Sequence, residues 1–575
     1  MMGQTYIAEL LQASVDHVLF IEDRFGQRSP LSLCDQDAIA QSIPPIQSDI
    51  LRLDDEITQL KTTLSLLESH RDRLNHSIEK GRWLAFPPPV CKLPSEVLAS
   101  IFSFSLPFSD GYNRLSLDHK KHKLPVPIPM LVSVVCSSWR KTALSTSKLW
   151  SAISFEFNKS WSRRSEPDDI LAKIEHLRWI TELFITRART SPLALRFYSG
   201  YSWPPAGDRT WGDINRALET LCQRSAQWFS VDFSIEWPRH SFPAIWQSIK
   251  GNLPNLHKLS ACPAALPALT PIFADSCPAL KAIELHSFRD EDFDAIGIRV
   301  PWHQVEDLRV SGAVVPRMFA IVELVSLCPN LTSFHYSYPN YAARSDNPAN
   351  DAAANNLTSN MKTLSLPSSP GNDHHHAWVT FLDHFTLPRL SSLTLTAQLS
   401  GSRGECGDLS PLLQCISRSS CSITTLTIVT NNLTGAQYRE LFSLMPWVTS
   451  LTVAPERGRP ILELLDLLLV DNSTTDGETS QHLLPRLRNL VVTGYLYDLN
   501  SDQFERVFDR LYQVVKSRWT PSAAPQKSLR SVTIPVRPFS REETAIDRES
   551  PGLEKLRELG EQGLELFIKT DWYMT

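Results

Sequence analysis

The sequence predicts a multi-domain protein with three parts: a long amino-terminal helix that forms a coiled coil, a small all-α module and an irregular α/β repeat solenoid. Three observations predict this class. Apolar residues recur at heptad spacing near the amino terminus, two short amphipathic segments follow a proline run, and one apolar string then recurs ten times. A chain of 575 residues is also too long for a single compact core.

The composition is that of a folded protein without a strong electrostatic preference. Hydrophobic residues make up 42%, charged residues 21%, and the formal net charge is -5. We therefore expect no nucleic-acid partner, which would usually need a basic surface. The amino terminus lacks a basic region followed by an apolar core, and the apolar stretch Ile461–Val470 is short and carries two carboxylates. We expect no signal peptide, no membrane contact and a cytoplasmic or nuclear location.

Residues 46–78 have the spacing of a heptad seam. Ile50, Ile57, Leu64, Arg71 and Ile78 fall at position a, and Ile46, Leu53, Leu60, Leu67 and Leu74 fall at position d. Mostly β-branched residues at a with leucine at d favour a parallel two-stranded coil. The alternative is a single amphipathic helix packed on its own protein. We assign residues 46–82 to this helix, and residues 1–45, whose helical pattern breaks at Pro30 and at Pro44–Pro45, to a segment of unknown role.

A small helical module is expected at residues 83–152. The run Phe86-Pro87-Pro88-Pro89 ends the heptad helix, because consecutive prolines cannot donate backbone hydrogen bonds. Leu93-Pro94-Ser95-Glu96 then starts a helix, with proline and a carboxylate in its first turn. Residues 106–129 are polar and proline-containing and are predicted to form a loop. One further amphipathic helix places Leu131, Val135 and Trp139 at i, i+4 and i+8.

The order of residues in this module resembles the F-box. The matching positions are Leu93, Pro94, Glu96, Ile101, Phe102, Val135, Cys136, Trp139, Arg140, Ala143, Leu149 and Trp150. The long internal loop departs from the family pattern. The heptad helix, Trp83 and the proline run make the chain similar to fungal, basidiomycete-type F-box proteins. The resemblance implies that the module docks the Skp adaptor of a cullin–RING ubiquitin ligase. The residues expected to make that contact are Leu93, Pro94, Glu96, Val97, Ile101, Phe102, Val135, Cys136, Trp139, Leu149 and Trp150.

Residues 190–575 carry the recurring string apolar-x-x-apolar-x-apolar, after a connecting helical segment at 153–189. The ten strings begin at Leu256, Leu280, Val305, Leu331, Met361, Leu390, Ile423, Val448, Leu487 and Leu529. Earlier copies are expected at Leu193 and Phe229, and a last helix–strand unit at Leu553–Leu559 and Leu564–Ile568. Ala320–Leu327 and Ile461–Leu469 are candidate helices between strings, and residues 344–360 are a candidate disordered insertion. The period is typical of a leucine-rich repeat, in which each unit gives one short strand and one helix.

Stacked repeats present a concave strand face that suits protein recognition. The candidate binding residues on this face are Lys281, Glu284, Arg309, Ser333, His335, Thr394 and Thr427. Most of them are expected to be merely solvated. The run His374-His375-His376, with His384 beyond it, is expected to be a polar loop and not a metal site, because adjacent residues of a helix or strand cannot all face one ion. We find no catalytic motif, so neither an enzyme nor a cofactor is expected.

The function implied is therefore an F-box adaptor that links a target protein, bound by the repeats, to a Skp–cullin–F-box ubiquitin ligase. The alternative is a coiled-coil and leucine-rich-repeat scaffold that self-associates through residues 46–78 and has no ligase role.

Overall fold

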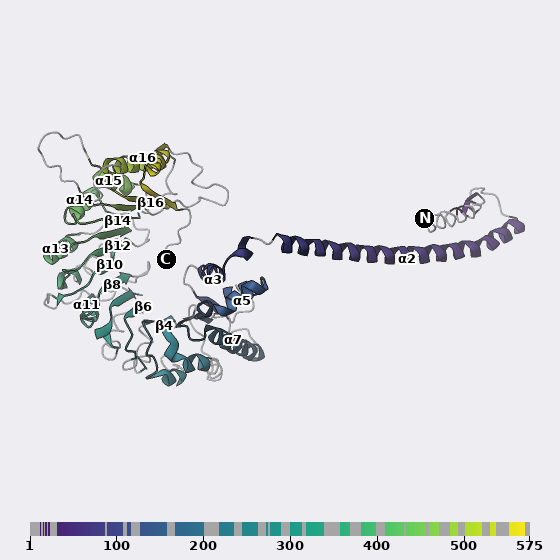
Figure 1. Cartoon of the computed structure of the whole chain (residues 1–575), viewed down its shortest axis with the longest axis horizontal. Coiled ribbons are helices and arrows are strands. Elements are labelled where there is room, and N and C mark those ends of the chain that lie inside the picture. Colours follow the sequence, from purple (N-terminus) through teal and green to yellow (C-terminus); the bar gives the residue numbers. More distant parts are fainter. Residues whose placement is uncertain are drawn as a thin grey trace. The chain divides into compact units, whose positions relative to one another are not determined.

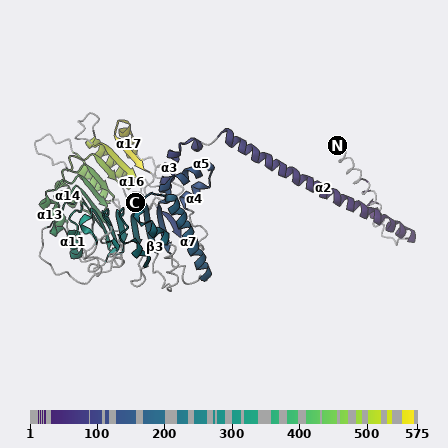
Figure 2. The same cartoon turned by 60° about the horizontal axis from the view of Figure 1, so that its bottom comes forward.

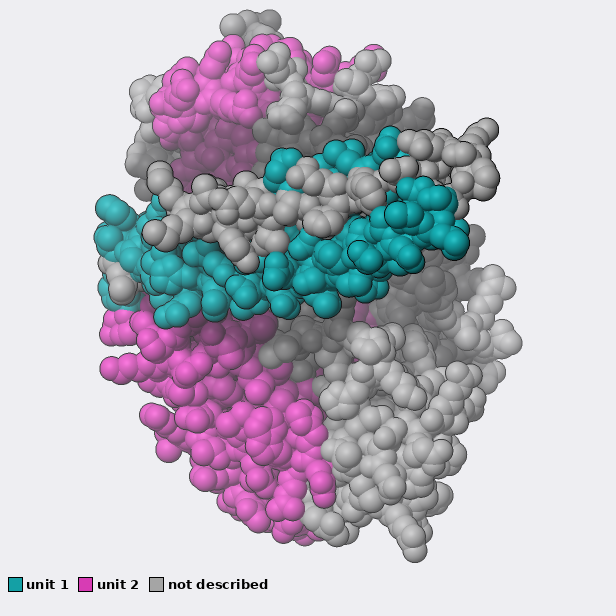
Figure 3. All heavy atoms as spheres, turned by 90° about the vertical axis from the view of Figure 1, so that its right-hand side faces the viewer, with its two compact units in different colours: residues 1–94 teal, residues 95–575 magenta. Residues whose placement is uncertain are grey.

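The computed structural model divides the chain into two compact units, residues 1–94 and residues 95–575 (Figure 3). It describes residues 32–86, 89–106, 112–116, 127–157, 167–199, 218–234, 244–262, 272–273, 277–288, 300–312, 318–337, 357–368, 381–397, 409–429, 433–454, 459–470, 483–492, 501–519, 529–535 and 551–569, with isolated positions between 12 and 23. No helix in these ranges is long and apolar enough to cross a membrane.

The first unit is dominated by one helix, α2 (Leu33–Ala85), of 53 residues (Figure 1). The Ser32 side chain caps its amino terminus by accepting a hydrogen bond from the Asp35 backbone amide at 3.2 Å. The predicted helix is present, but it starts 13 residues earlier than the predicted residue 46. Pro44 and Pro45 lie inside α2 and do not end it. A proline interior to a helix removes a hydrogen bond but does not always stop the helix.

The helical module of the second unit contains four short elements: α3 (Ser95–Phe104), α4 (Ile128–Ser133), α5 (Ser137–Ser145) and the 3₁₀ helix η2 (Ser147–Trp150). The single helix predicted across Leu131–Trp139 is wrong, because α4 ends at Ser133 and α5 begins at Ser137. The Arg140 Nε atom donates to the Ser133 carbonyl at 2.8 Å across this break. The predicted loop 106–129 is also partly wrong, because it contains a strand, β1 (Asn113–Ser116), and the start of α4.

Fifteen described strands form one sheet in sequence order, and every pair in it is parallel. Besides β1, the strands are β2 (Ala152–Phe157), β3 (Leu193–Ser199), β4 (Trp228–Ser234), β5 (Lys258–Ala261), β6 (Ala282–Phe288), β7 (Asp307–Gly312), β8 (Ser333–Ser337), β10 (Thr363–Ser368), β12 (Ser392–Ala397), β13 (Thr425–Val429), β14 (Ser450–Val453), β15 (Asn489–Val492), β16 (Ser531–Pro535) and β17 (Glu565–Lys569). All ten predicted strings, the two earlier copies and the final unit give strands.

The sheet is curved, and helices cover its convex side (Figures 1 and 2). The longer helices are α7 (Pro167–Ala188), α11 (Met318–Ser326), α13 (Ser410–Ser419), α14 (Gly435–Ser443), α15 (Arg459–Leu468), α16 (Ser501–Arg518) and α17 (Pro551–Glu561). Two repeats use a 3₁₀ helix instead, η4 (Ala244–Ile249) and η7 (Trp302–Gln304), and η3 (Ser225–Gln227) follows the helical residues 218–223. This alternation of parallel strand and helix is the α/β repeat architecture that the period predicts.

The core lies between the sheet and these helices, and the repeated string explains why. In the copy at Leu280, the three apolar residues Leu280, Ile283 and Leu285 are at most 2% exposed. Phenylalanines fill the same layer near the start of the array, where Phe155, Phe197 and Phe233 stack with ring centroids 5.2 and 5.3 Å apart. No repeat could bury such a face alone, so the array is stabilised by its neighbours.

The array begins earlier than predicted. Strand β2 and helix α7 occupy the segment 153–189 that was expected to be only helical, and β1 lies inside the range assigned to the module. Of the predicted insertion 344–360, residues 344–356 lie outside the described residues. Leu357–Thr358 form strand β9, paired with β11 (Phe385–Thr386), so the prediction of disorder is wrong there. His374–His376 also lie outside the described residues.

Candidate interaction surfaces

Helix α3 exposes an apolar stripe. Val97, Ile101 and Phe104, at i, i+4 and i+7, are 42%, 41% and 73% exposed. Leu98 and Phe102, on the adjoining face, are buried. Leu131 on α4, with Val134 and Val135 in the break before α5, add three more exposed apolar side chains, and the three helices pack on one another. We call Val97, Ile101, Phe104, Leu131, Val134 and Val135 the apolar patch.

The module has a core of its own beneath this patch. The rings of Phe102 and Trp139 lie 4.9 Å apart. The Trp150 Nε1 atom donates to the Ala143 carbonyl at 2.8 Å, which satisfies the indole inside the core. Leu149 and Trp150 are at most 2% exposed. Phe102, Leu149 and Trp150 were expected to contact a partner. They are interior residues of the module in this structure, and their partner contact stays a prediction.

Trp139 is half-buried against Phe102. The other predicted contact residues fall into three groups. Val97, Ile101 and Val135 belong to the exposed patch, and Glu96 is exposed beside them. Cys136 is the amino-terminal cap of α5, where its Sγ atom accepts a hydrogen bond from the Trp139 amide at 3.5 Å. Leu93 and Pro94 belong to the first unit.

The module and the array share one unit through buried contacts. The Asn113 side chain on β1 donates to the carbonyls of Leu149 at 2.8 Å and Ala152 at 3.0 Å. The ring of Trp150 lies 5.0 Å from that of Phe184 on α7. Any protein bound at the patch would therefore be connected to the array without a linker between them.

The second candidate surface is the concave face, whose side chains are set in rows by the strand register. One row runs from β2 to β14 through Ser154, Arg196, Asp232, Ser260, Glu284, Arg309, His335, Ser365, Thr394, Thr427 and Thr452. Charge is concentrated in its first half. In the second half, on β10 to β14, this row and the next, Thr363, Ser392, Thr425 and Ser450, consist only of serine and threonine.

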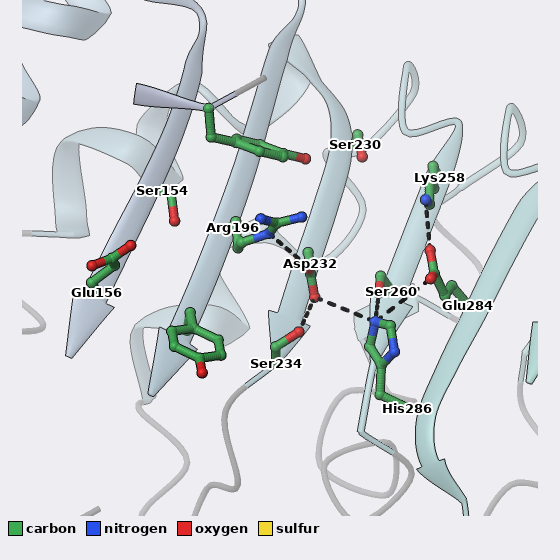
Figure 4. Close-up of a pocket in the computed structure, with 12 residues that line it drawn as sticks. Ser154, Glu156, Arg196, Ser230, Asp232, Ser234, Lys258, Ser260, Glu284 and His286 are labelled. Carbon is green, nitrogen blue, oxygen red and sulfur yellow. Dashed lines mark hydrogen bonds and ion pairs between the residues drawn. The ribbon is translucent and has the colours of Figure 1, made fainter. Parts of the chain in front are cut away.

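A hollow of about 400 Å³ lies in the charged half (Figure 4). We call it the charged hollow, and it is lined by Tyr112, Ser154, Glu156, Arg196, Tyr198, Ser230, Asp232, Ser234, Lys258, Ser260, Glu284 and His286. The Arg196 Nε atom donates to Asp232 at 2.9 Å, and the Lys258 Nζ atom donates to Glu284 at 2.6 Å. The Arg196 guanidinium also lies over the Tyr112 ring, 4.5 Å from its centroid.

His286 connects these two ion pairs. Its Nε2 atom lies 2.7 Å from the Ser260 hydroxyl, 4.0 Å from an Asp232 oxygen and 3.9 Å from a Glu284 oxygen (Figure 4). Burial works against ionisation of Glu284, but Lys258, His286 and Arg309 outweigh it and lower the pKa of that carboxyl. The hollow therefore holds oriented charges that can pair with charged or hydrogen-bonding groups of a ligand.

The sequence located part of this face. Glu284, Arg309, Ser333, His335, Thr394 and Thr427 lie at its alternating strand positions, as predicted. Lys281 does not, because it precedes β6 and donates to Glu306 at 2.8 Å. Arg196, Asp232 and His286 were missed as site residues. Two of the three had a signal in the sequence, because Arg196 and Asp232 are the charged residues inside the two early copies of the string.

The described residues contain no cluster of three or more metal-ligating side chains. His384 is buried in the short helical turn before β11.

Comparisons with known proteins give a structural match but no family. No protein-family model matches the chain, and no curated protein matches it. Among solved structures, the chain is similar to a Bacteroides fragilis protein solved by a structural genomics consortium, with 10% identity over 67% of this chain and 68% of that one. The TM-score of 0.21 is too low to carry an argument about fold or function.

Proposed function

We propose that this protein is an F-box adaptor: the apolar patch binds the Skp subunit of a cullin–RING ubiquitin ligase, and the concave face binds the target. The observation that carries the proposal is the apolar patch on α3, α4 and the break after α4. Its six side chains are 41% to 73% exposed on a module that already has its own buried core. Exposed apolar side chains gathered on one small module are typical of a binding surface.

The proposal assigns a separate role to each surface. The exposed apolar side chains of the patch favour burial against another protein, whereas the charged hollow suits a polar segment of a target. The buried contacts of Asn113 and Trp150 keep the two surfaces in one unit. The chain would then act by raising the effective concentration of the target near the catalytic subunits.

The experiment for the patch is co-purification of the full chain with its Skp adaptor. We expect a stable complex with the wild type and its loss in the double variant Ile101→Asp, Val135→Asp, because two carboxylates would be buried without partners. Leu444→Asp, at an exposed leucine just after α14, is the matched control and should keep the complex. Absence of a complex with the wild type, or its survival in the double variant, would overturn the proposal.

The experiment for the concave face compares two double variants that both keep the patch. Tyr198→Ala with Lys258→Ala changes the charged hollow, and Thr394→Ala with Thr427→Ala changes the hydroxyl rows. We expect the first pair to abolish Skp-dependent ubiquitylation of the bound target while Skp binding persists. We expect the second pair to retain it. The opposite result would move the target site to the second half of the array.

A further inference from the structure

Helix α2 carries an apolar seam that the adaptor proposal does not use. Along residues 46–78, none of the ten a and d side chains is buried, and the apolar ones at Ile50, Ile57, Leu60, Leu64, Leu67, Leu74 and Ile78 are 46% to 63% exposed. Within the first unit, residues 1–94, no described residue covers these side chains. Among the described residues, α2 therefore resembles one half of a coiled coil.

We propose that two copies of this chain associate through residues 46–78 as a parallel, in-register, two-stranded coiled coil. The helix is continuous across the whole seam, which spans roughly 50 Å at 1.5 Å per residue. Position a is isoleucine at Ile50, Ile57 and Ile78, and position d is leucine in four of its five layers, at residues 53, 60, 67 and 74. This division of branched side chains favours two parallel strands over larger bundles.

The charges beside the seam favour the same orientation. In the parallel arrangement, Glu56 at position g faces Lys61 at position e of the second copy, and the pair occurs twice. Asp49 and Asp54 oppose each other there, but Arg52 lies 4.0 Å from Asp49 and offsets the repulsion. In the antiparallel arrangement that overlaps all ten layers, Lys61 would face Lys61 of the second copy, and Asp54 would face Glu68. Both contacts bring like charges together.

Arg71 interrupts the seam at position a. In the single chain its guanidinium is directed to Asp72, with Nη2 and Oδ1 3.1 Å apart. This ion pair can persist in the dimer, because a long side chain at position a can reach solvent past the seam. A single charged a layer weakens a coil but disfavours other registers and oligomers. The in-register dimer is the arrangement in which both Arg71 side chains share that one layer.

The first test is the mass of the full chain in solution by light scattering. We expect twice the chain mass of 64.9 kDa at micromolar concentration, and the single-chain mass for Leu60→Asp with Leu67→Asp. The matched control is Leu51→Asp with Leu66→Asp, at two equally exposed leucines outside the seam, and it should remain dimeric. A monomeric wild type, or a dimer that survives the seam variant, would overturn the proposal.

The second test fixes the orientation. In a Cys34→Ser background, Ile50→Cys should form an intermolecular disulfide, because an in-register pair brings the two position-50 side chains together. Leu51→Cys, one residue off the seam, should not. In the antiparallel dimer, residue 50 would face residue 74, about 36 Å along the helix, and only a mixture of Ile50→Cys and Leu74→Cys chains would cross-link. That result would overturn the parallel arrangement. Neither test depends on Skp binding.

Discussion

The Nε atom of Arg518 lies 2.6 Å from the carbonyl oxygen of Leu468, which belongs to the preceding repeat. Its Nη1 and Nη2 atoms donate to the carbonyls of Leu484 and Leu483 at 2.9 and 2.7 Å. Arg418, near the end of α13, makes the same kind of contact with the carbonyls of Leu382 and Phe385. In both places an arginine in the last turn of a helix donates to backbone carbonyls of the preceding repeat.

We predict that Arg518→Met destabilises the array by roughly 3–5 kcal/mol, because three part-buried carbonyls lose a charged donor. Burial lowers the pKa of the Arg518 guanidinium to about 10, so it remains charged at neutral pH. Thermal unfolding followed by calorimetry measures the effect. Arg506→Met, at an exposed position of the same helix, is the control and should change stability by less than about 0.5 kcal/mol. Equal melting temperatures for the two variants would show that the Arg518 hydrogen bonds do not stabilise the array.

A second prediction concerns the phenylalanine stack in the first repeats. Phe197 is fully buried between Phe155 and Phe233, with the rings 11° from parallel on either side. Phe197→Ala should destabilise the protein by about 3–5 kcal/mol, since it removes a large side chain and leaves a cavity. Phe229→Ala, at a 44% exposed phenylalanine one repeat later, should cost much less in the same chemical denaturation experiment. Similar losses for both would show that the stack contributes little beyond surface packing.

The strands of this fold were predictable from the sequence because each buries the same three apolar positions, and the string at Leu280 shows all three inside. Charged partners across strands were not predictable. Arg196 and Asp232 are 36 residues apart in the chain, and only the register of β3 on β4 brings their side chains to 2.9 Å. The length between repeats varies, so the sequence does not give that register.

Tertiary contacts, which the sequence pattern does not show, also decide which residues of the helical module are buried. Phe102, Leu149 and Trp150 have the apolar character of a binding surface, and periodicity cannot tell which apolar face is turned inward. The tertiary contacts decide it, since the Trp150 indole finds its hydrogen-bond acceptor at Ala143 inside the module. Strand β1 was hidden by the polar segment around it, where four prolines indicate a loop.

A third prediction uses two glycines of α17. A Cβ atom at Gly552 would lie 2.6 Å from the backbone of Phe508 and Asp509 in α16, closer than packed atoms can approach. Gly552→Ala should therefore push the two helices apart and destabilise the protein by about 1–3 kcal/mol. Gly560→Ala in the same helix places its Cβ 3.5 Å from Leu566, an ordinary contact, and should be neutral or stabilising by up to about 1 kcal/mol. Calorimetry of both variants checks the contrast, and loss of stability in both would contradict it.

A fourth prediction concerns the pH dependence contributed by His335 on the concave face. Burial, and then the Arg309 charge, lower the pKa of its imidazole below 6.5, against weaker opposing effects of Asp307 and Glu284. The unfolded chain therefore binds a proton at higher pH than the folded chain. The stability contributed by neutral His335 is fully present above pH 6.5 and is lost as the pH falls through the folded-state pKa. His335→Gln removes this titration. The unfolding free energy of the wild type minus that of the variant should therefore be smaller at pH 5.5 than at pH 7.5. Urea unfolding at the two pH values measures it, and a difference that stays constant would show that folding leaves the imidazole pKa unchanged.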